Sequence, residues 1–530
     1  MAVLLSSCAK TEQAAQGGEQ NAWTKPHVLT FGDFGEIATL NPHLSTFADT
    51  QYIGQLTSAY LIRWNRSNSP VPDLITVIPS KANGGVSVDG LTITYHLRHG
   101  VKWSDGAPFT ADDVTFSTSV VLNPKNNETN RSGWTQITKV DEPDKYTVVY
   151  HLSKPYSPFV ETFFSSAEAN PSVLPKHLLA QYPTINTIPY NEKPVGIGPF
   201  VVDHWDRGSQ VVLKANPLYW RGRPKLDEII FKELPDRNTL LAQLQTHEID
   251  MWPLIPGAYL SQVKSIPGVV VFREPSYYWN NVSFNLAHPV MQDHAVRQAL
   301  YYAFDRRTIF AKIAHGIGVL SDVPTPPNVS YAVTGVPVTP FDLSKANQIL
   351  NSAGWVRGPD GVRSKNGTRL AFTWVTTAGN ADVDNMIAII QADYAKIGAT
   401  MSVKHVPGAV LFAPDGQLAS GKWDIANFAW LADAVGDYSQ LFACNAFSPS
   451  GQNYPHWCNK QADAAMDSLY AHYDQTDRDR DVAVFMKQFL ADLPVMVYDI
   501  REDMYGYNSD LKNFRPNNIS QFDNMMDVDI

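Results

Sequence analysis

Side chains able to do chemistry are abundant in this 530-residue chain, but none stands in the spacing of a familiar catalytic motif. The patterns HExxH, GxSxG, GxxxxGK[ST] and CxxC are all absent from the sequence. A carboxylate chosen at random from the 52 Asp and Glu residues is far more often a solvated surface group than a catalytic one. The sequence therefore favours binding over catalysis, and it predicts no catalytic residue and no cofactor.

The first of the three cysteines, Cys8, ends a short apolar run, MAVLLSSC, that resembles the lipobox of bacterial lipoproteins. In such proteins the cysteine becomes the first residue of the mature chain and is acylated, so the resemblance implies a lipid anchor on Cys8. Residues 9–22 are polar and without apolar periodicity, which predicts a flexible tether. The alternative is an ordinary frayed terminus that contains a cysteine by chance.

Cys444 and Cys458 then remain as an even pair in a segment rich in Gly, Ser and Asn. Because loop cysteines of an exported chain are rarely left free, we expect them to form a disulfide. The alternative is two unrelated buried thiols, since a disulfide requires Cα atoms within about 7 Å and sequence alone does not show that distance.

Composition narrows the class of protein. A chain of this length is expected to bury at least two cores. The formal charge of -10 argues against a general affinity for nucleic acid, which depends on Lys and Arg displacing counterions from phosphates. No apolar run approaches the roughly 20 residues of a membrane-spanning helix.

Local patterns indicate a mixed α/β chain. Alternation around Asp89-Gly90 predicts a hairpin over residues 86–98, and Thr110 with Asp113 predicts the capped start of a helix. The clearest α/β unit is a strand at 370–375, a helix at 383–397 and a strand at 401–406. Further strands are expected at 146–152, 196–202, 211–213, 229–233 and 424–430, and helices at 238–245, 290–315 and 459–470.

A series of ordered landmarks resembles the family-5 extracytoplasmic solute-binding proteins, the receptors of peptide and nickel ABC importers. They are LRHGVKWSDGAPFTADDVTFS at 97–117, GIGPF at 196–200, NPLYW at 216–220, LQTHEIDMW at 244–252 and SFNLAHPVMQDHAVRQALYYAFDRRTI at 283–309. The resemblance spans roughly residues 25–525. It implies an α/β type II periplasmic-binding-protein fold, in which two lobes joined by a hinge close over a solute, with an extra inserted α+β domain.

The implied fold divides the chain into four parts. Residues 1–22 are the lipobox and tether, and residues 61–194 are the inserted domain. Lobe I is discontinuous and takes residues 23–60, 195–275 and 492–530, whereas lobe II takes residues 276–491. The two strand crossings between the lobes are expected near residues 274–281 and 493–499.

The segment from Trp430 to Cys458 resembles the corresponding part of dipeptide- and oligopeptide-binding proteins. There, the Asp that follows the Trp by three residues pairs with the ligand's α-ammonium, which assigns that role to Asp433, with Trp430 and Ala432 beside it. A charge-assisted hydrogen bond in a cleft that expels water suits an ammonium ligand. The alternative for Asp433 is a loop cap, since Asp is common in turns.

Two further segments resemble parts of the family's cleft. FGDFGEIATLNPH at 31–43 resembles the first cleft loop, where Gly35 and Glu36 would line the ligand site. Dipeptide-specific members carry a carboxylate-binding Arg at the position that Thr377 occupies here. A fixed dipeptide length is therefore not expected, and the partner of the ligand's carboxylate is open.

The resulting prediction is a monomeric receptor, lipid-anchored at a bacterial cell surface or in the periplasm, that delivers a peptide to the permease subunits of an ABC importer. Other solutes are alternatives. An oligosaccharide would stack on Trp430, Trp423 or Trp279, and a nickel complex is suggested by the family although His294, His315 and His456 are scattered. A secreted hydrolase and a peptide-sensing receptor are the alternatives from other classes.

Overall fold

The computed structural model describes residues 20–530 apart from residues 36, 168–169, 235, 414 and 449. Cys8, the tether up to residue 19 and Glu36 therefore lie outside the described residues.

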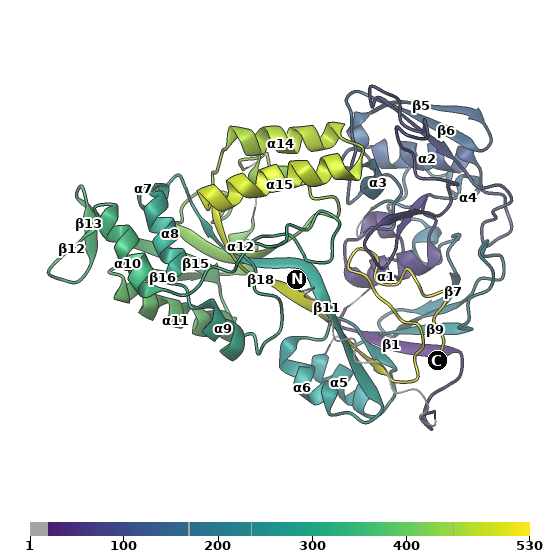
Figure 1. Cartoon of the computed structure of the whole chain (residues 1–530). Helices are drawn as coiled ribbons and strands as arrows, with labels where there is room; N and C mark the ends of the chain where they lie inside the picture. The colour runs from purple at the N-terminus through teal and green to yellow at the C-terminus, as the bar shows by residue number, and fades with distance from the viewer. Residues whose placement is uncertain (1–19, 36, 168–169, 235, 414, 449) are drawn as a thin grey trace, which may run out of the picture.

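A ten-stranded sheet runs through the molecule in the order β16-β15-β17-β11-β18-β10-β1-β9-β8-β7 (Figure 1). Lobe I contributes the side from β10 to β7, and lobe II contributes β15, β16 and β17. The strands are β1 Val28–Asp33, β7 Phe200–Asp206, β8 Gln210–Ala215, β9 Glu228–Glu233, β10 Met251–Trp252, β11 Val269–Phe284, β15 Ala371–Thr377, β16 Thr400–Val406, β17 Ile425–Leu431 and β18 Val495–Asn508.

The long antiparallel strands β11 and β18 connect the two lobes. The C-terminal half of β18 pairs with β10 of lobe I, whereas residues 278–284 of β11 pair with β17 of lobe II. Both crossings predicted from sequence, at 274–281 and 493–499, lie at these strands. Their register shifts between Pro275 and Trp279 and again between Asn280 and Asn281, so the pairing is irregular where the strands pass between the lobes.

Lobe I forms its core between parallel strands and short helices. β1 pairs in parallel with β9 through six consecutive residues, and the strand interiors are buried. The strand predicted over 196–202 begins only at Phe200, because a Cβ on Gly196 or Gly198 would lie within 2.2 Å of a backbone carbonyl oxygen of α1 or its end. The helices are α1 Ala48–Thr57, α5 Arg237–Gln245 and α6 Leu260–Lys264.

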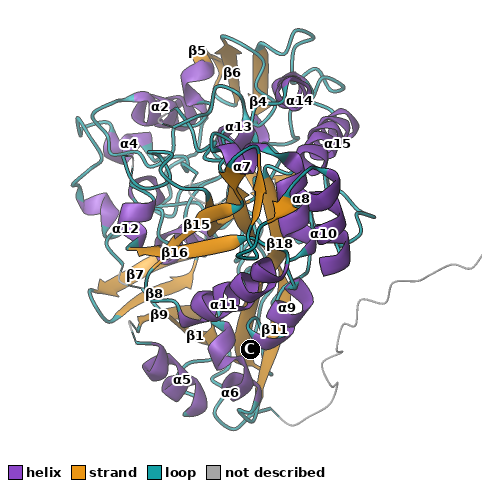
Figure 2. Ribbon diagram, turned by 90° about the vertical axis from the view of Figure 1, so that its left-hand side faces the viewer, coloured by secondary structure: helices purple, strands orange, loops and turns teal. Residues whose placement is uncertain are grey.

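Lobe II contains the predicted β15-α11-β16 unit, in which β15 and β16 are parallel. Figure 2 shows α8, α10 and α11 packed beside the central strands. The helices are α7 Pro289–Gln292, α8 His294–Tyr302, α9 Arg306–Lys312, α10 Leu343–Ser352, α11 Ala381–Lys396, α12 Gly408–Leu411, α13 Ser439–Phe442, α14 Lys460–Ala471 and α15 Gln475–Asp492. A small sheet joins β12 Val356–Arg357, β13 Arg363–Lys365 and β14 Thr368–Arg369.

The single helix predicted over 290–315 was wrong, because the segment forms α7, α8 and α9. Asp293 caps α8 by accepting from Ala295 N, and Asp305 caps α9 by accepting from Thr308 N. Each cap supplies an acceptor for first-turn N–H groups, so a new helix starts there with a new direction. As a result Arg306, which helical periodicity places off the apolar stripe, is buried.

The elements of residues 61–194 lie outside the large sheet. They are β2 Ile62–Trp64, β3 Pro70–Pro72, β4 Thr92–His96, β5 Ile137–Asp144, β6 Thr147–Leu152, α2 Ala111–Leu122, α3 Phe159–Thr162 and α4 Lys176–Leu179. The capping box at Thr110 and Asp113 is confirmed. The predicted hairpin forms around Asp89-Gly90: Ser87 N donates to Thr92 O, Thr94 N donates to Gly85 O, and Val86 pairs with Ile93, while the other edge of β4 pairs with β6.

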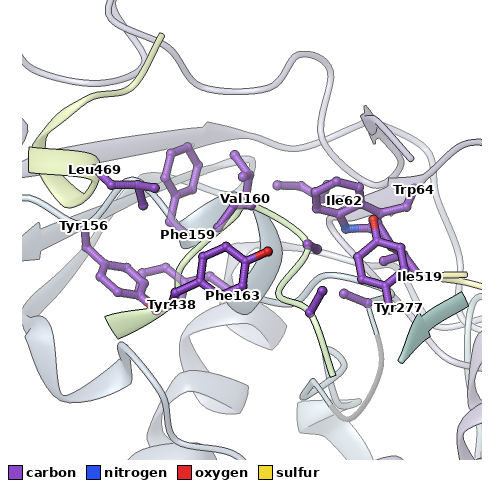
Figure 3. Packing of buried hydrophobic residues seen from close by; sticks show 14 of the residues in the cluster. Ile62, Trp64, Tyr156, Phe159, Val160, Phe163, Tyr277, Tyr438, Leu469 and Ile519 are labelled. Atoms are coloured by element: carbon purple, nitrogen blue, oxygen red, sulfur yellow. The ribbon is translucent and has the colours of Figure 1, made fainter. Parts of the chain in front are cut away.

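One apolar core joins this inserted region to lobe II. Trp64 and Phe159 belong to the same buried cluster as Tyr438 and Leu469, and Figure 3 shows these side chains of the cluster. Ser157 Oγ donates a hydrogen bond of 2.6 Å to the carbonyl oxygen of Leu469. The inserted region and lobe II are therefore in direct contact, with buried apolar side chains between them.

Candidate functional site

The segment that carries Asp433 begins at the end of β17 and is covalently closed further on. Cys444 and Cys458 form a disulfide with their Cα atoms 4.7 Å apart, so the predicted pairing is confirmed. At the start of the segment, Ala432 N donates 2.8 Å to Tyr277 O and so prolongs the pairing of β17 with β11. Asp433 therefore lies two residues after the end of β17, next to the last residue that is hydrogen-bonded to β11.

Asp433 is held in a defined position by its own loop. Its Oδ1 accepts from Val435 N at 2.8 Å and from Asp437 N at 2.9 Å. Its carbonyl oxygen accepts a hydrogen bond from the Tyr331 hydroxyl. The capping geometry considered as an alternative is therefore present, and it orients the carboxyl group while leaving the second oxygen to face the inserted region.

That second oxygen meets a residue that sequence reasoning missed. Glu161, in α3 of the inserted region, places its carboxyl group near that of Asp433, close enough for the charge of Asp433 to raise the pKa of Glu161. Glu161 Oε1 also lies 3.4 Å from Ala434 N, which donates to it. No motif singles out Glu161, because it is 272 residues from Asp433 and only the packing of the inserted region on lobe II brings the two together.

Burial and like charge make this pair difficult to ionise. Burial, together with the charge of Asp437, raises the pKa of Asp433 to about 7. Burial and the charge of Asp433 raise the pKa of Glu161 well above its usual range. Among the described residues, no Lys, Arg or His forms an ion pair with either carboxyl group. The two side chains can therefore retain one shared proton, or both ionise around an added cation.

The two Trp side chains predicted to meet the ligand are packed within the protein. Trp430 is buried and packs against Trp279 with ring centroids 5.2 Å apart, and it also contacts Phe428 and Phe442. Trp423 is 2% exposed, and its indole N–H donates to Leu418 O. Both Trp side chains thus contribute to packing in this state, and a contact of either with ligand stays a prediction.

Thr377 lies on another part of lobe II. It ends β15, pairs with Val406 of β16 and is partly exposed. Its role opposite a ligand carboxylate is untested by these contacts.

Gly35 lines a cavity of about 740 Å³ on lobe I, at the ends of β1 and β10. A Cβ on Gly35 would lie 1.6 Å from Asp49 Oδ2, so only Gly fits at this approach. Asp33 and Asp49 both line this cavity, and burial raises the pKa of both. Arg237 also lines the cavity, whereas Asp433 is not among its lining residues.

No group of three or more His, Cys, Asp or Glu side chains among the described residues is arranged to hold a metal ion. A search of that same part of the chain finds no helix with the length and apolar character required to cross a membrane. The site geometry is suited to binding a cation through oxygen atoms of Asp and Glu side chains.

Two α/β lobes joined by paired crossing strands define a type II periplasmic binding protein. The sequence pattern of the bacterial extracellular solute-binding proteins, family 5 (middle region), matches residues 70–452, and the chain belongs to this family.

Similar proteins are known in several bacteria. The oligopeptide-binding protein AppA of Bacillus subtilis (strain 168) is 26% identical over 506 residues, covering 93% of this chain and 90% of that protein. The dipeptide-binding protein of Escherichia coli (strain K12) is 29% identical over 427 residues, covering 76% and 77%. Among solved structures, NikZ from Campylobacter jejuni in complex with Ni(L-His) is 26% identical, with a TM-score of 0.74 over 96% of this chain and 100% of that one.

Proposed function

We propose that the protein is the extracytoplasmic receptor of an ABC importer and that it captures peptides by their α-ammonium group at Asp433. The lobes close over the peptide by bending at β11 and β18, and the closed receptor delivers it to the permease subunits. The relatives that bind oligopeptides and dipeptides by name support this class of ligand. A lipid on Cys8 would hold the receptor, as a monomer, at the outer face of a bacterial membrane.

The observation that carries the proposal is the unbalanced charge at Asp433. Its carboxyl group is oriented by two backbone N–H donors, partly buried and without a cationic partner among the described residues. A carboxyl group in such a position interacts strongly with an ammonium ion, because the low local dielectric and the fixed geometry both favour the charged pair.

Native mass spectrometry of the purified protein incubated with a casein hydrolysate tests this function. The expected result is a set of bound masses that denaturation identifies as peptides with free amino termini. Retention of a single sugar or of nickel would overturn the peptide assignment, and steady release of cleaved peptides would indicate a hydrolase.

A titration then tests which end of the peptide is recognised. Tri-alanine is expected to bind measurably by isothermal titration calorimetry, whereas N-acetyl-tri-alanine, which lacks the ammonium charge, should bind at least about 30-fold more weakly, the factor that corresponds to about 2 kcal/mol. Equal affinity of the two peptides would place recognition elsewhere on the ligand.

A further inference from the structure

We infer that Glu161 is the second carboxylate of the ammonium subsite, so that the inserted domain and lobe II each supply one acid and a protonated amine is clamped between them. The inference rests on the proposed function, because the amine is the amino terminus of the captured peptide. It assigns to the inserted domain a direct part in ligand selection and in closure.

Glu161 is held rigidly where it faces Asp433. Its carbonyl oxygen accepts from Asn170 Nδ2 at 2.8 Å, and its neighbours Phe159 and Val160 are buried in the core that joins the inserted region to lobe II. Glu161 Oε2 is shielded from solvent and has no hydrogen-bond partner among the described residues. A buried carboxylate oxygen without a partner is costly unless a ligand supplies one.

A third polar group, the Tyr277 hydroxyl, is a further candidate partner for the ammonium ion. Tyr277 is 4% exposed, and its hydroxyl has no hydrogen-bond partner in the described part of the chain. Its backbone is bonded to Ala432, next to Asp433, and both Glu161 and Asp433 interact electrostatically with its hydroxyl. Figure 3 shows Tyr277 beside Trp64 and Ile62 of the inserted region.

The number of acceptors matches an ammonium ion. An ammonium group has three N–H donors and no acceptor, and Glu161, Asp433 and Tyr277 offer three oxygens from three different elements. A neutral amide, such as an acetylated amino terminus, has one N–H donor and no charge, so it would leave both acids unbalanced. The subsite is therefore expected to select for a free amino terminus.

The other groups that face the acids do not neutralise them. Asp437, from the same loop, adds a negative charge whose effect reaches Glu161 and Asp433, and Tyr156, Tyr331 and Tyr438 are the remaining titratable neighbours. No basic side chain forms an ion pair with either acid in the part of the chain that the structure describes.

The pair therefore makes closure depend on a cation or a proton. In the contact seen here the carboxyl pKa values are raised, so protonation favours the contact. Without ligand, the stabilisation of the contact is complete at acid pH and is lost as pH rises through about 7, the raised pKa of Asp433. At neutral pH an ammonium ion replaces the missing proton, and empty closure is disfavoured.

Calorimetry with tri-alanine tests Glu161→Gln, with Glu142→Gln on the exposed face of the same domain as matched control. We expect Glu161→Gln to weaken tri-alanine binding about 10-fold or more while N-acetyl-tri-alanine changes little, so that the preference for the free amino terminus shrinks. Glu161→Asp should restore part of this preference, which a purely structural role would not do. Wild-type affinity and preference in Glu161→Gln would overturn the inference and leave the proposed function intact.

Small-angle X-ray scattering of the ligand-free protein gives a readout that does not need a peptide. The radius of gyration of the wild type is expected to increase between pH 5 and pH 8, whereas Glu161→Gln and Glu161→Ala should show at most half of that change. Circular dichroism checks that both variants are folded. If the wild type binds no peptide but scattering shows this difference, the proposed function fails, and only the pH-dependent contact between the two acids stands. Equal pH responses of all proteins would overturn the clamp.

Discussion

Two pairs of ionisable side chains in this protein differ in how their charge is balanced. Arg306 and Asp322 of lobe II are 2% and 4% exposed, and Arg306 Nη1 lies 2.7 Å from Asp322 Oδ1. The guanidinium also donates to the carbonyl oxygens of Val497 and Thr339. Glu161 and Asp433, by contrast, place two acids together with no base between them.

The difference distinguishes an ion pair that stabilises the fold from an acid pair that we infer to bind a ligand. A buried ion pair of opposite charges is balanced within the chain, and removing one member leaves the other unbalanced. A pair of like charges is incomplete until a proton or a cation joins it. Substitution should therefore reduce stability at the first pair and ligand affinity at the second.

The largest effect is expected for Arg306→Met. It leaves Asp322 as an unpaired buried charge, so the free energy of unfolding should fall by about 3–5 kcal/mol. Urea denaturation followed by circular dichroism measures the loss. Arg223→Gln, which removes one member of an ion pair whose side chains are 62% and 51% exposed, is the control and should leave the midpoint unchanged. Equal midpoints for both variants would remove the distinction between the two kinds of pair.

Asp433→Asn should have the next largest effect, and on binding rather than on stability. The amide oxygen can still accept from Val435 N and Asp437 N, so the loop is retained while the negative charge is lost. We expect tri-alanine affinity to fall by about 2–5 kcal/mol, or 30-fold and more, by calorimetry.

The matched control for Asp433→Asn is Asp467→Asn, at an exposed position of α14. This variant should bind peptide like the wild type. The melting temperature of Asp433→Asn in the absence of peptide should be no lower than that of the wild type at pH 8, since a repulsion has been removed. Unchanged affinity would exclude Asp433 from the subsite.

A smaller, pH-dependent effect is expected at Glu274 in β11. Burial and the neighbouring charge of Asp503 raise the pKa of Glu274 to about 8. A raised carboxyl pKa means that stability is complete below about pH 4.5 and is lost as pH rises to about 8. Glu274→Gln should therefore melt like the wild type at pH 4.5 and at a higher temperature at pH 9, measured by calorimetry. The exposed control Glu192→Gln should follow the wild type at both pH values. If Glu274→Gln did the same, ionisation of Glu274 would not destabilise the fold.

Local sequence patterns predicted most of the helices and strands. The β15-α11-β16 unit and the capped start of α2 follow from periodicity and capping chemistry, which act within a few residues. The predictions failed where distant segments intervene. The strand expected from residue 196 starts at Phe200, after the stretch where α1 lies against Gly196 and Gly198.

The candidate site was predicted in part. The disulfide of Cys444 and Cys458 and the position of Asp433 at the end of a strand lie within one stretch of chain, where motif and spacing are informative. The ligand contacts of Trp430, Ala432, Thr377 and Gly35 stay predictions, and Cys8 and Glu36 lie outside the described residues. Glu161 could not have been selected, because one acid among 52 has no sequence signal for its partner.

By itself, the sequence determined the family, the two-lobed class of fold and the acid expected to meet an amine, since these depend on ordered motifs and on short-range spacing. Only the tertiary structure decided that this acid faces a second one from the inserted domain and that Arg306 is buried. The physical reason is that burial and charge balance depend on the atoms within a few ångströms in space, and here those atoms belong to segments far apart in the chain.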